Sequence, residues 1–405
     1  MGVIVQKFGG TSVADAEKIH RAARRAIRAK LEGKQVVMVV SAMGKTTDKL
    51  VALAQDVSPH PPKREMDMLL TTGEQVTIAL MAMAIHSVGH EAISFTGGQV
   101  GMITDASHSK ARIKKIDADR IREHLDAGRI AIVAGFQGIT EDGAITTLGR
   151  GGSDTTAVAL AAALNAEVCE IYTDVDGVYT TDPRIVPQAR KLDTISYDEM
   201  LEMASLGAGV MHSRAIEFGK KYNVPIHVRS SLTDANGTMI LAETSDMEEI
   251  VVRGAALKRD LARVVLRGVP NKMGVAAQVF ARIAKHNIMV DDIIQNVYRE
   301  HNIANIGFTT NASEAMEAQA VCDDLARELG IESVELDEKV AKVSVVGIGM
   351  KTHSGVAAKM FNALAEAKVN IENISTSEIV ISCIVRLDDA EKALQTIHDV
   401  FELDK

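Results

Sequence analysis

The fold of this chain follows from one stretch near its start, Val3-Ile4-Val5-Gln6-Lys7-Phe8-Gly9-Gly10-Thr11-Ser12. An apolar strand runs into a glycine turn, and a helix pattern follows from about Ala14 to Leu31. The same order recurs up to about residue 245, which is the pattern of a parallel sheet covered by helices. Further strands are predicted at Gln35–Ser41, Glu91–Phe95, Ile130–Gly135, Val168–Thr173 and Ile226–Arg229. We therefore predict an α/β fold with an open, mostly parallel sheet sandwiched by helices.

Length, charge and apolar patterning narrow the class of protein. A chain of 405 residues corresponds to two or three domains. Its 54 acidic residues outnumber 45 basic ones, and the net charge of −9 disfavours nucleic-acid binding. The longest apolar runs have about eight residues, far fewer than the roughly 20 that a membrane span needs. The strand at Val3 leaves no room for a secretion signal, and the three cysteines lack a CxxC pair, so we expect a cytoplasmic protein.

The second half of the chain contains an internal repeat with an offset of about 80 residues. Gly274–Phe280 recurs as Gly355–Phe361, each time at the start of an amphipathic helix. The strand that precedes each helix repeats as Ala262–Gly268 and Ala341–Gly347. The strand after each helix is expected at Ile288 to Val290 and at Val369 to Ile371. Each copy reads as a βαββαβ unit with an open sheet edge, so we expect copies from two chains to pair side by side.

The domain boundaries follow from these two patterns. A first domain is predicted over residues 1–248, and the two repeats over residues 262–338 and 341–405. Internal methionines such as Met239 and Met247 precede the repeats and would allow a separately translated subunit made of the repeats alone.

Two glycine-rich stretches are candidate anion sites. Lys7-Phe8-Gly9-Gly10 joins a strand to a helix, so backbone amides and a lysine could hold a phosphate. In Gly149-Arg150-Gly151-Gly152-Ser153-Asp154, Ser153 and Asp154 could cap the next helix and Arg150 could grip a carboxylate. The alternatives are a plain strand-to-helix turn and a hairpin tip before a capped helix. Two anion sites indicate two anionic substrates.

Other motif-like stretches carry less chemistry. Gly44-Lys45-Thr46 lacks the first glycine of a P-loop, because that position is Val39. The polar loop after Thr173 lacks the glutamate of a calcium loop. Glu74 is predicted to head a helix, where the helix dipole alone could favour an acid.

These motifs together closely resemble the aspartate kinase family across essentially the whole chain. The resemblance rests on Lys7–Ser12, the turn at Thr72-Gly73-Glu74, Gly149–Asp154 and Thr173–Arg184. It implies an amino-acid-kinase catalytic domain followed by two ACT domains, which are ferredoxin-like α+β units. The implied reaction transfers the γ-phosphoryl group of ATP, with Mg²⁺ carried on the nucleotide, to the side-chain carboxylate of L-aspartate. That reaction is the entry step to lysine, threonine and methionine synthesis.

The resemblance also implies roles for individual residues. Lys7 and Asp154 would act at the reacting centre, with Lys7 neutralising charge that builds up during transfer. Glu74 would bind the substrate's ammonium and Arg150 its α-carboxylate. The remaining positions around aspartate would be Ser41, Thr47, Gly151, Gly152 and Ser153. The nucleotide would be held by Lys7, Phe8, Gly9, Gly10, Thr173, Asp174, Tyr179, Asp182 and Arg184. One departure is Gly209, which stands where many relatives carry a lysine on the nucleotide side.

In this family lysine, threonine or both bind between paired ACT domains, usually of a homo-oligomer. The corresponding residues of the first repeat would be Asn271, Lys272, Met273, Gly274, Asp291, Asp292 and Gln295. Those of the second repeat would be His353, Ser354, Val356, Asn370, Ile371, Asn373 and Glu378. A carboxylate such as Asp291 could pair with an effector's ammonium. The alternative is that these polar residues only cap helices and line a dimer interface.

Two classes of rival function stay open. Another kinase of the same fold could act on glutamate, N-acetylglutamate or a nucleoside monophosphate. The last two need no partner for a free ammonium, so Glu74 together with Arg150 argues against them. A catalytically silent amino-acid sensor is the rival from a different class, against which intact Lys7, Glu74, Arg150 and Asp154 argue.

Overall fold

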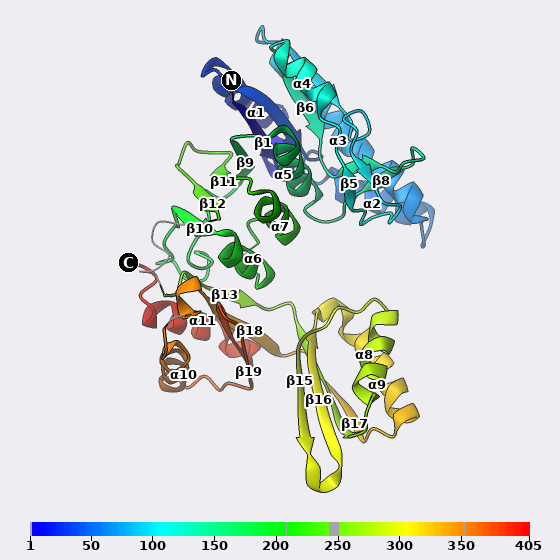
Figure 1. The fold of residues 1–405 in the computed structure, drawn as a ribbon, viewed down its shortest axis with the longest axis vertical. Helices are drawn as coiled ribbons and strands as arrows, with labels where there is room; N and C mark the ends of the chain where they lie inside the picture. Colours follow the sequence, from blue (N-terminus) through cyan, green and yellow to red (C-terminus); the bar gives the residue numbers. More distant parts are fainter. Residues whose placement is uncertain (1, 208, 243–250, 352) are drawn as a thin grey trace. The chain divides into compact units, whose positions relative to one another are not determined.

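The computed structural model describes residues 2–207, 209–242, 251–351 and 353–405, which form two compact units (Figure 1). The first unit holds residues 2–179, 191–205 and 209–242. The second holds residues 180–190, 206–207, 251–351 and 353–405. The predicted domain boundary at residue 248 lies outside the described residues.

The main sheet of the first unit has eight strands in the order β10-β12-β11-β9-β1-β2-β6-β3. Their bounds are β1 Val3–Phe8, β2 Gln35–Val40, β3 Ala92–Phe95, β6 Ile130–Ala134, β9 Val168–Thr173, β10 Thr194–Ser196, β11 Ile226–Ser230 and β12 Thr238–Leu241. Every neighbouring pair is parallel except β11 with β12. The six strands predicted from the sequence and the mostly parallel sheet are therefore confirmed.

Helices cover both faces of this sheet. On one face α1 (Ala16–Leu31) and α3 (Lys63–His86) pack together over Ile4 and Phe8 of β1. On the other face α5 (Gly152–Leu164) packs against β1, β2 and β9, with α4 (Asp119–Asp126) over β6 and α7 (Ser213–Tyr222) against α5. The remaining helices of the unit are α2 (Thr46–Val57) and α6 (Tyr197–Ser205). Because side chains alternate along a strand, Lys7 faces α5 while its neighbour Phe8 faces α1 and α3.

Among the described residues, α3 is the one helix long and apolar enough to cross a membrane by length and composition. In the fold it packs against α1, β3 and β6. It also carries polar side chains that are buried inside the unit, namely Asp67, Thr71, Glu74 and Thr77. This burial of polar groups against other elements is the pattern of a core helix.

A second, small sheet of the first unit has the order β5-β4-β7-β8. Its strands are β4 (Ile103–Thr104), β5 (Ile113–Lys115), β7 (Gln137–Ile139) and β8 (Ile145–Thr147). Strand β8 contacts α3 and leads directly into the loop that carries Arg150. The small sheet therefore links α3 to that loop.

The second unit contains the two repeats, and each has a four-stranded antiparallel sheet. The first consists of β14 (Ala262–Pro270), α8 (Val275–Lys285), β15 (Asp291–Tyr298), β16 (Ile303–Thr310), α9 (Ala315–Leu329) and β17 (Ser333–Asp337). The second consists of β18 (Val340–Val346), α10 (Val356–Glu366), β19 (Asn373–Thr376), β20 (Val380–Arg386) and α11 (Ala390–Val400).

The repeat is confirmed in detail at the helix starts. Both α8 and α10 begin after a left-handed glycine, with φ of 88° at Gly274 and 95° at Gly355. The strands after these helices start later than predicted, at Asp291 and Asn373. The apolar residues expected to form those strands instead enter the repeats' cores, as Ile288 and Val369 do.

The second repeat's sheet is completed by a strand from outside the repeat. Strand β13 (Gly254–Lys258) pairs antiparallel with β18 and gives the order β13-β18-β20-β19. The first repeat has the order β17-β14-β16-β15, so β13 takes the place that β17 has there. The first repeat is thus inserted between two parts of the second. Pairing of copies from two chains stays a prediction.

We predict that Gly347→Ala destabilises the second unit, because a Cβ there would lie 2.3 Å from the carbonyl oxygen of Val251. That approach accompanies the hydrogen bond from Arg253 N to Val346 O at 2.7 Å, beside β13. Crowding of this kind costs about 1–3 kcal/mol. Thermal unfolding should show a lower melting temperature than wild type.

The matched control is Gly307→Ala in β16, where a Cβ would meet its nearest neighbour at an ordinary 3.8 Å. Equal melting temperatures for the two alanine variants would contradict the close approach of the segment before β13 to Gly347.

Candidate active site

The carboxyl ends of neighbouring parallel strands meet at one edge of the main sheet. After β1, the N–H of Gly9 donates to the Tyr172 carbonyl of β9 over 3.4 Å. After β2, the N–H of Ser41 donates to the last carbonyl of β1 over 3.1 Å, and after β6 the N–H of Gly135 donates to the last carbonyl of β2 over 3.0 Å. The three loops are therefore tied side by side, at the edge where open parallel sheets bind ligands.

Lys7 extends from β1 towards the start of α5. Its Nζ lies 2.5 Å from Asp154 Oδ1, and both side chains are only 12% exposed. Asp154 occupies the first turn of α5, where the helix dipole favours a negative charge. A phosphate at this position would meet the ammonium of Lys7 and the first amides of α5. The side chain of Phe8 is fully buried and stacks on Tyr172, so only the backbone of Phe8 lies at the sheet edge.

The predicted cap of α5 was wrong. The helix begins at Gly152, and its N-cap is Gly151 with a φ of 66° and no side-chain cap. Ser153 and Asp154 are therefore residues of the first turn, and Ser153 Oγ accepts a hydrogen bond from Ser41 Oγ over 2.9 Å. A Cβ at Gly151 would lie 2.2 Å from the Cβ of His212, which leaves room only for glycine.

Glu74 lies in the middle of α3, so the prediction that it heads a helix was also wrong. The glycine before it is not a turn signal but a point of close approach. A Cβ on Gly73 would lie 2.8 Å from the Cβ of Ala42, just after β2. This approach lets Glu74 Oε1 accept the N–H of Ala42 over 3.0 Å.

The carboxylate of Glu74 is almost completely buried, at 3% exposed, and it has unused bonding capacity. Its Oε2 has no hydrogen-bond partner among the described residues. Burial raises the pKa of Glu74 to about 7, although the hydrogen bond from Ala42 N–H acts in the opposite direction. A cation against Oε2 would supply the missing partner and stabilise the ionised form. The geometry therefore suits a bound ammonium.

Arg150 is exposed, and no ion pair is recorded for it within the described residues. It stands between two left-handed glycines, Gly149 and Gly151. The start of its loop is fixed by Arg214, whose Nη1 donates to the carbonyl of Leu148 over 2.9 Å. The loop thus presents a guanidinium that is available for a carboxylate.

Sequence reasoning missed Asp67, which anchors this loop to α3. The carboxylate of Asp67 is fully buried and accepts hydrogen bonds from Thr147 Oγ1 at 2.6 Å, His108 Nδ1 at 2.8 Å and Ser109 N at 3.0 Å. Thr147 ends β8 and lies three residues before Arg150. Because Asp67 and Glu74 are seven residues apart, they share one face of α3. A single helix therefore holds Glu74 and the strand that leads to Arg150.

The other predicted residues of the first unit occupy separate short segments. Thr47 lies half-buried in the first turn of α2. Thr173 ends β9, and its hydroxyl donates to Asp174 Oδ1 over 3.1 Å. The hydroxyl of Tyr179 donates to Asp176 over 2.8 Å, and burial together with that bond raises the pKa of Tyr179. A Cβ on Gly209 would meet no described atom within 4 Å.

Asp182 and Arg184 belong to the second unit, unlike the other residues predicted to hold the nucleotide. They pair with each other, with Arg184 Nη2 2.7 Å from Asp182 Oδ2 and Arg184 Nε 2.9 Å from Asp182 Oδ1. The hydrogen bond from Arg184 lowers the pKa of Asp182. The side chain of Arg184 is exposed.

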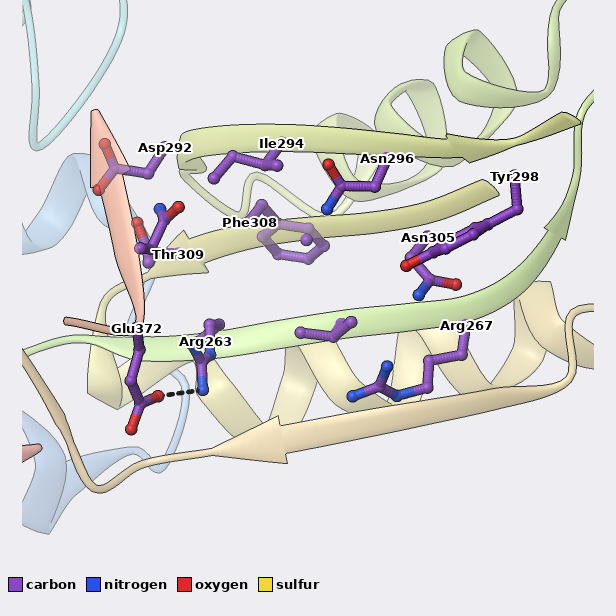
Figure 2. A pocket seen from close by; sticks show the side chains of 13 residues that line it. Arg263, Arg267, Asp292, Ile294, Asn296, Tyr298, Asn305, Phe308, Thr309 and Glu372 are labelled. Carbon is purple, nitrogen blue, oxygen red and sulfur yellow. Dashed lines mark hydrogen bonds and ion pairs between the residues drawn. The ribbon is translucent and has the colours of Figure 1, made fainter. Parts of the chain in front are cut away.

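A cavity of about 210 Å³ lies on the sheet of the first repeat, next to the start of β19 (Figure 2). It is bordered by charged and amide side chains, among which Arg263 pairs with Glu372 at 2.6 Å. Of the residues suggested for an effector site, Asp292 and Asn373 line it. The other suggested residues do not.

Asp291, the carboxylate suggested to bind an effector's ammonium, already pairs with the side-chain ammonium of Lys342. Lys342 Nζ lies 2.7 Å from Asp291 and 2.5 Å from Asp292, and the lysine side chain is 4% exposed. Burial acts to raise the pKa of Asp291, but the hydrogen bond and charge of Lys342 lower it overall. Lys342 of the second repeat therefore joins the two repeats through an exposed carboxylate, Asp291, and through a buried one, Asp292.

The remaining suggested effector residues are spread over the repeats. Met273 is fully exposed beside Gly274, and Gln295 is exposed on the edge strand β15. His353 Nδ1 lies 2.9 Å from the carbonyl of Gly349, and Val356 is buried at the start of α10. Exposed positions among the rest are Asn370 and Glu378, while Asn271 and Ile371 are partly buried.

Comparison with known proteins decides the family. The amino acid kinase family model matches residues 2–230, and an ACT domain model matches residues 343–401. Aspartokinase 2 of Bacillus subtilis is 53% identical over 405 residues, which cover 100% of this chain and 99% of that protein. The aspartate kinase of Pseudomonas putida is 50% identical over 405 residues, covering 100% and 98%. The chain belongs to the aspartate kinase family.

Solved structures of the aspartate kinase family agree with this assignment. E. coli aspartokinase III in complex with aspartate and ADP has a TM-score of 0.83 at 28% identity, covering 98% of this chain and 99% of that chain. The same protein in complex with lysine and aspartate has a TM-score of 0.79 at 28% identity, with the same coverage. The present chain is thus an aspartate kinase, a phosphotransferase with a carboxyl group as acceptor.

We predict that Glu74→Gln makes this aspartate kinase more stable above pH 7. The folded state binds the Glu74 proton more tightly than the unfolded chain, so the cost of ionising it in the fold grows from about pH 4.5 to pH 7. A pKa raised from 4.5 to about 7 corresponds to roughly 3 kcal/mol. Urea unfolding of both proteins should show a gain of about 2–3 kcal/mol at pH 8 and little gain at pH 4.5. A gain that does not depend on pH would refute the buried ionisation.

We predict that Thr147→Val raises KM for the acceptor amino acid several-fold and leaves KM for ATP unchanged. Valine keeps the volume of threonine but removes the donor to Asp67, so the strand before Arg150 loses its fixed position. Steady-state kinetics with each substrate varied in turn would measure the split. A suitable control is Thr72→Val, because that hydroxyl bonds only within α3, to the carbonyl of Leu69. Equal changes in both KM values would contradict a role specific to the Arg150 loop.

Proposed function

We propose that this enzyme transfers the γ-phosphoryl group of MgATP to the side-chain carboxylate of L-aspartate, giving 4-phospho-L-aspartate and ADP. The observation that carries the proposal is the buried carboxylate of Glu74 with its unpartnered Oε2. L-Aspartate offers an ammonium to Glu74, an α-carboxylate to Arg150, and a second carboxylate for transfer. In this assignment Ser41, Thr47, Gly151, Gly152 and Ser153 complete the surroundings of the amino acid.

The proposed transfer needs positioning and charge stabilisation more than proton chemistry. One oxygen of the side-chain carboxylate bonds to the γ-phosphorus while the bond from that phosphorus to the bridging oxygen breaks, and the electron pair leaves with ADP. The attacking carboxylate is already ionised at pH 7, so no general base is required. Lys7, held by Asp154, would stabilise the charge that develops on the transferring group.

The nucleotide would bind where the loops after β1 and β9 meet. Gly9 and Gly10 bring backbone close to the phosphates, and the base and ribose would contact Thr173, Asp174 and Tyr179. Asp182 and Arg184 complete the proposed set. The Mg²⁺ ion would arrive on the nucleotide and supply charge neutralisation on its phosphates.

The same site argues against two of the rival substrates. N-acetylglutamate and nucleoside monophosphates lack a free ammonium, so they would leave Glu74 Oε2 buried without a partner, which is costly. Glutamate keeps both end groups and is one methylene longer, so it is the closest competitor. A silent sensor would have no use for the pairing of Lys7 with Asp154.

We also propose that lysine, threonine or both act as effectors on the repeats. The lysine complex of E. coli aspartokinase III supports an effector of this kind in the family. An effector ammonium at Asp291 would compete with Lys342 for the same carboxylate. The proposal includes a homo-oligomer that pairs through the repeats, and a separately made subunit that consists of the repeats alone. It also places the enzyme in the cytoplasm, at the first step of lysine, threonine and methionine synthesis.

The direct test is ADP production from MgATP with aspartate, glutamate, N-acetylglutamate or UMP, with hydroxylamine present to trap an acyl phosphate. We expect hydroxamate only with aspartate, and less of it when lysine or threonine is added. Absence of aspartate-dependent hydroxamate would overturn the proposal. If lysine or threonine still bound in that case, the result would favour the catalytically silent amino-acid sensor instead.

Lys7→Ala should lower kcat with aspartate by about a hundredfold or more, because one charge-stabilising group is lost. The control is Lys18→Ala, which removes a lysine from an exposed ion pair with Asp15 at the start of α1. Equal activities of the two variants would contradict the role assigned to Lys7.

A further inference from the structure

One hairpin is shared by the two compact units. At its base, in the first unit, Leu192 N donates to Val178 O over 2.8 Å, and Tyr179 forms a bridge with Lys191. Its tip, residues 180–190, belongs to the second unit. The hairpin ladder continues there, since Thr180 N donates to Arg190 O over 2.9 Å. The chain therefore crosses from one unit to the other and back within a single hairpin.

The tip is built into the second repeat. Val186 is fully buried in that repeat's hydrophobic core. The N–H of Ala255, in β13, donates to the carbonyl of Thr180 over 2.7 Å. His398 of α11 places Nε2 3.1 Å from Thr180 Oγ1, and the same hydroxyl accepts the N–H of Arg190 over 3.0 Å. Thr180 is therefore fixed through both its backbone and its side chain.

His398 is a buried polar group that the proposed chemistry does not use. The residue is 0% exposed, and its Nδ1 has no hydrogen-bond partner among the described residues. Burial lowers the pKa of His398, although the nearby Asp399 acts to raise it. The neutral imidazole forms one hydrogen bond, between Nε2 and the hydroxyl of Thr180. Buried polar groups need such partners, so the pair fixes the orientation of α11 relative to the hairpin tip.

The tip also carries Asp182 and Arg184, two of the residues proposed to hold the nucleotide. Val186 N and Ile185 N both donate to the carbonyl of Asp182 over 3.0 Å, so Asp182 is part of the ordered turn that ends in the buried Val186. Tyr179, the residue before Thr180, is a third proposed nucleotide residue. The proposed nucleotide loop is therefore anchored at Thr180 by groups of the second repeat.

We infer that His398 is a positioning residue for nucleotide binding, acting through Thr180 on the hairpin that carries Asp182 and Arg184. This inference rests on the proposed function. The second repeat is then connected to the proposed nucleotide loop by the hydrogen bond between His398 and Thr180.

The test measures binding of MgADP and of aspartate to the full-length protein by titration calorimetry. Thr180→Val keeps the side-chain volume and removes the hydroxyl, and His398→Leu removes the imidazole. Each should weaken MgADP binding about three- to tenfold, as expected for one lost hydrogen bond, and change aspartate binding less than twofold. The double variant should lose little more than either single one, because both remove the same contact. His398→Gln, whose amide can reach Thr180, should recover part of the affinity.

Ser382→Ala is the matched control, since it removes a different buried hydrogen bond of the same repeat, to Ser344 at 2.7 Å. It should lower stability without changing MgADP affinity. Unchanged MgADP affinity in folded Thr180→Val would overturn the inference, and that variant alone decides if His398→Leu does not fold. Wild-type protein that binds no MgADP would instead overturn the proposed function, and the inference with it.

Discussion

The parallel order of β9, β1, β2 and β6 is the constraint on which the rest of the site depends. Parallel strands end at the same edge, so loops from distant parts of the chain are brought together there. Alternation along β1 then turns Lys7 towards α5, where Asp154 meets it at 2.5 Å. Helix α3 closely approaches Ala42, just after β2. This approach requires a glycine at residue 73, because a Cβ there would collide with Ala42. The roles proposed for Lys7, Glu74 and Asp154 follow from this edge and from the helices that border it.

The buried carboxylates of α3 give this helix its proposed roles. The helix brings two carboxylates into the interior, and their surroundings differ. Asp67 has three hydrogen-bond donors and serves as an anchor, whereas Glu74 has one and keeps an oxygen without a partner. A buried carboxylate with spare capacity is unfavourable for folding and favourable for binding a cation. A ligand's ammonium at Glu74 would thus supply the hydrogen-bond partner that Oε2 lacks.

Much of the fold could be predicted from local patterns, because short apolar strands between glycine-rich turns have a clear signature. The main strands, the repeat and the helix starts beside Gly274 and Gly355 could all be predicted in that way. The failures have a common cause, which is contact with residues far along the chain. Gly73 looks like a turn unless Ala42 is known to pack against it. Asp67 has partners 41 to 80 residues away, and β13 pairs with a strand whose residues lie 84 to 92 positions later.

The central claim is that the Glu74 carboxylate receives the ammonium of the substrate, and proton release on binding tests it most directly. Calorimetric titration of aspartate at pH 6.5, in buffers of different ionisation enthalpy, gives the number of protons exchanged. With a pKa of about 7 in the free enzyme, Glu74 is mostly protonated at that pH and must ionise to pair with the ammonium. The account predicts release of more than about half a proton by wild-type enzyme and none by Glu74→Gln. Aspartate binding by wild-type enzyme without proton release at pH 6.5 would contradict it.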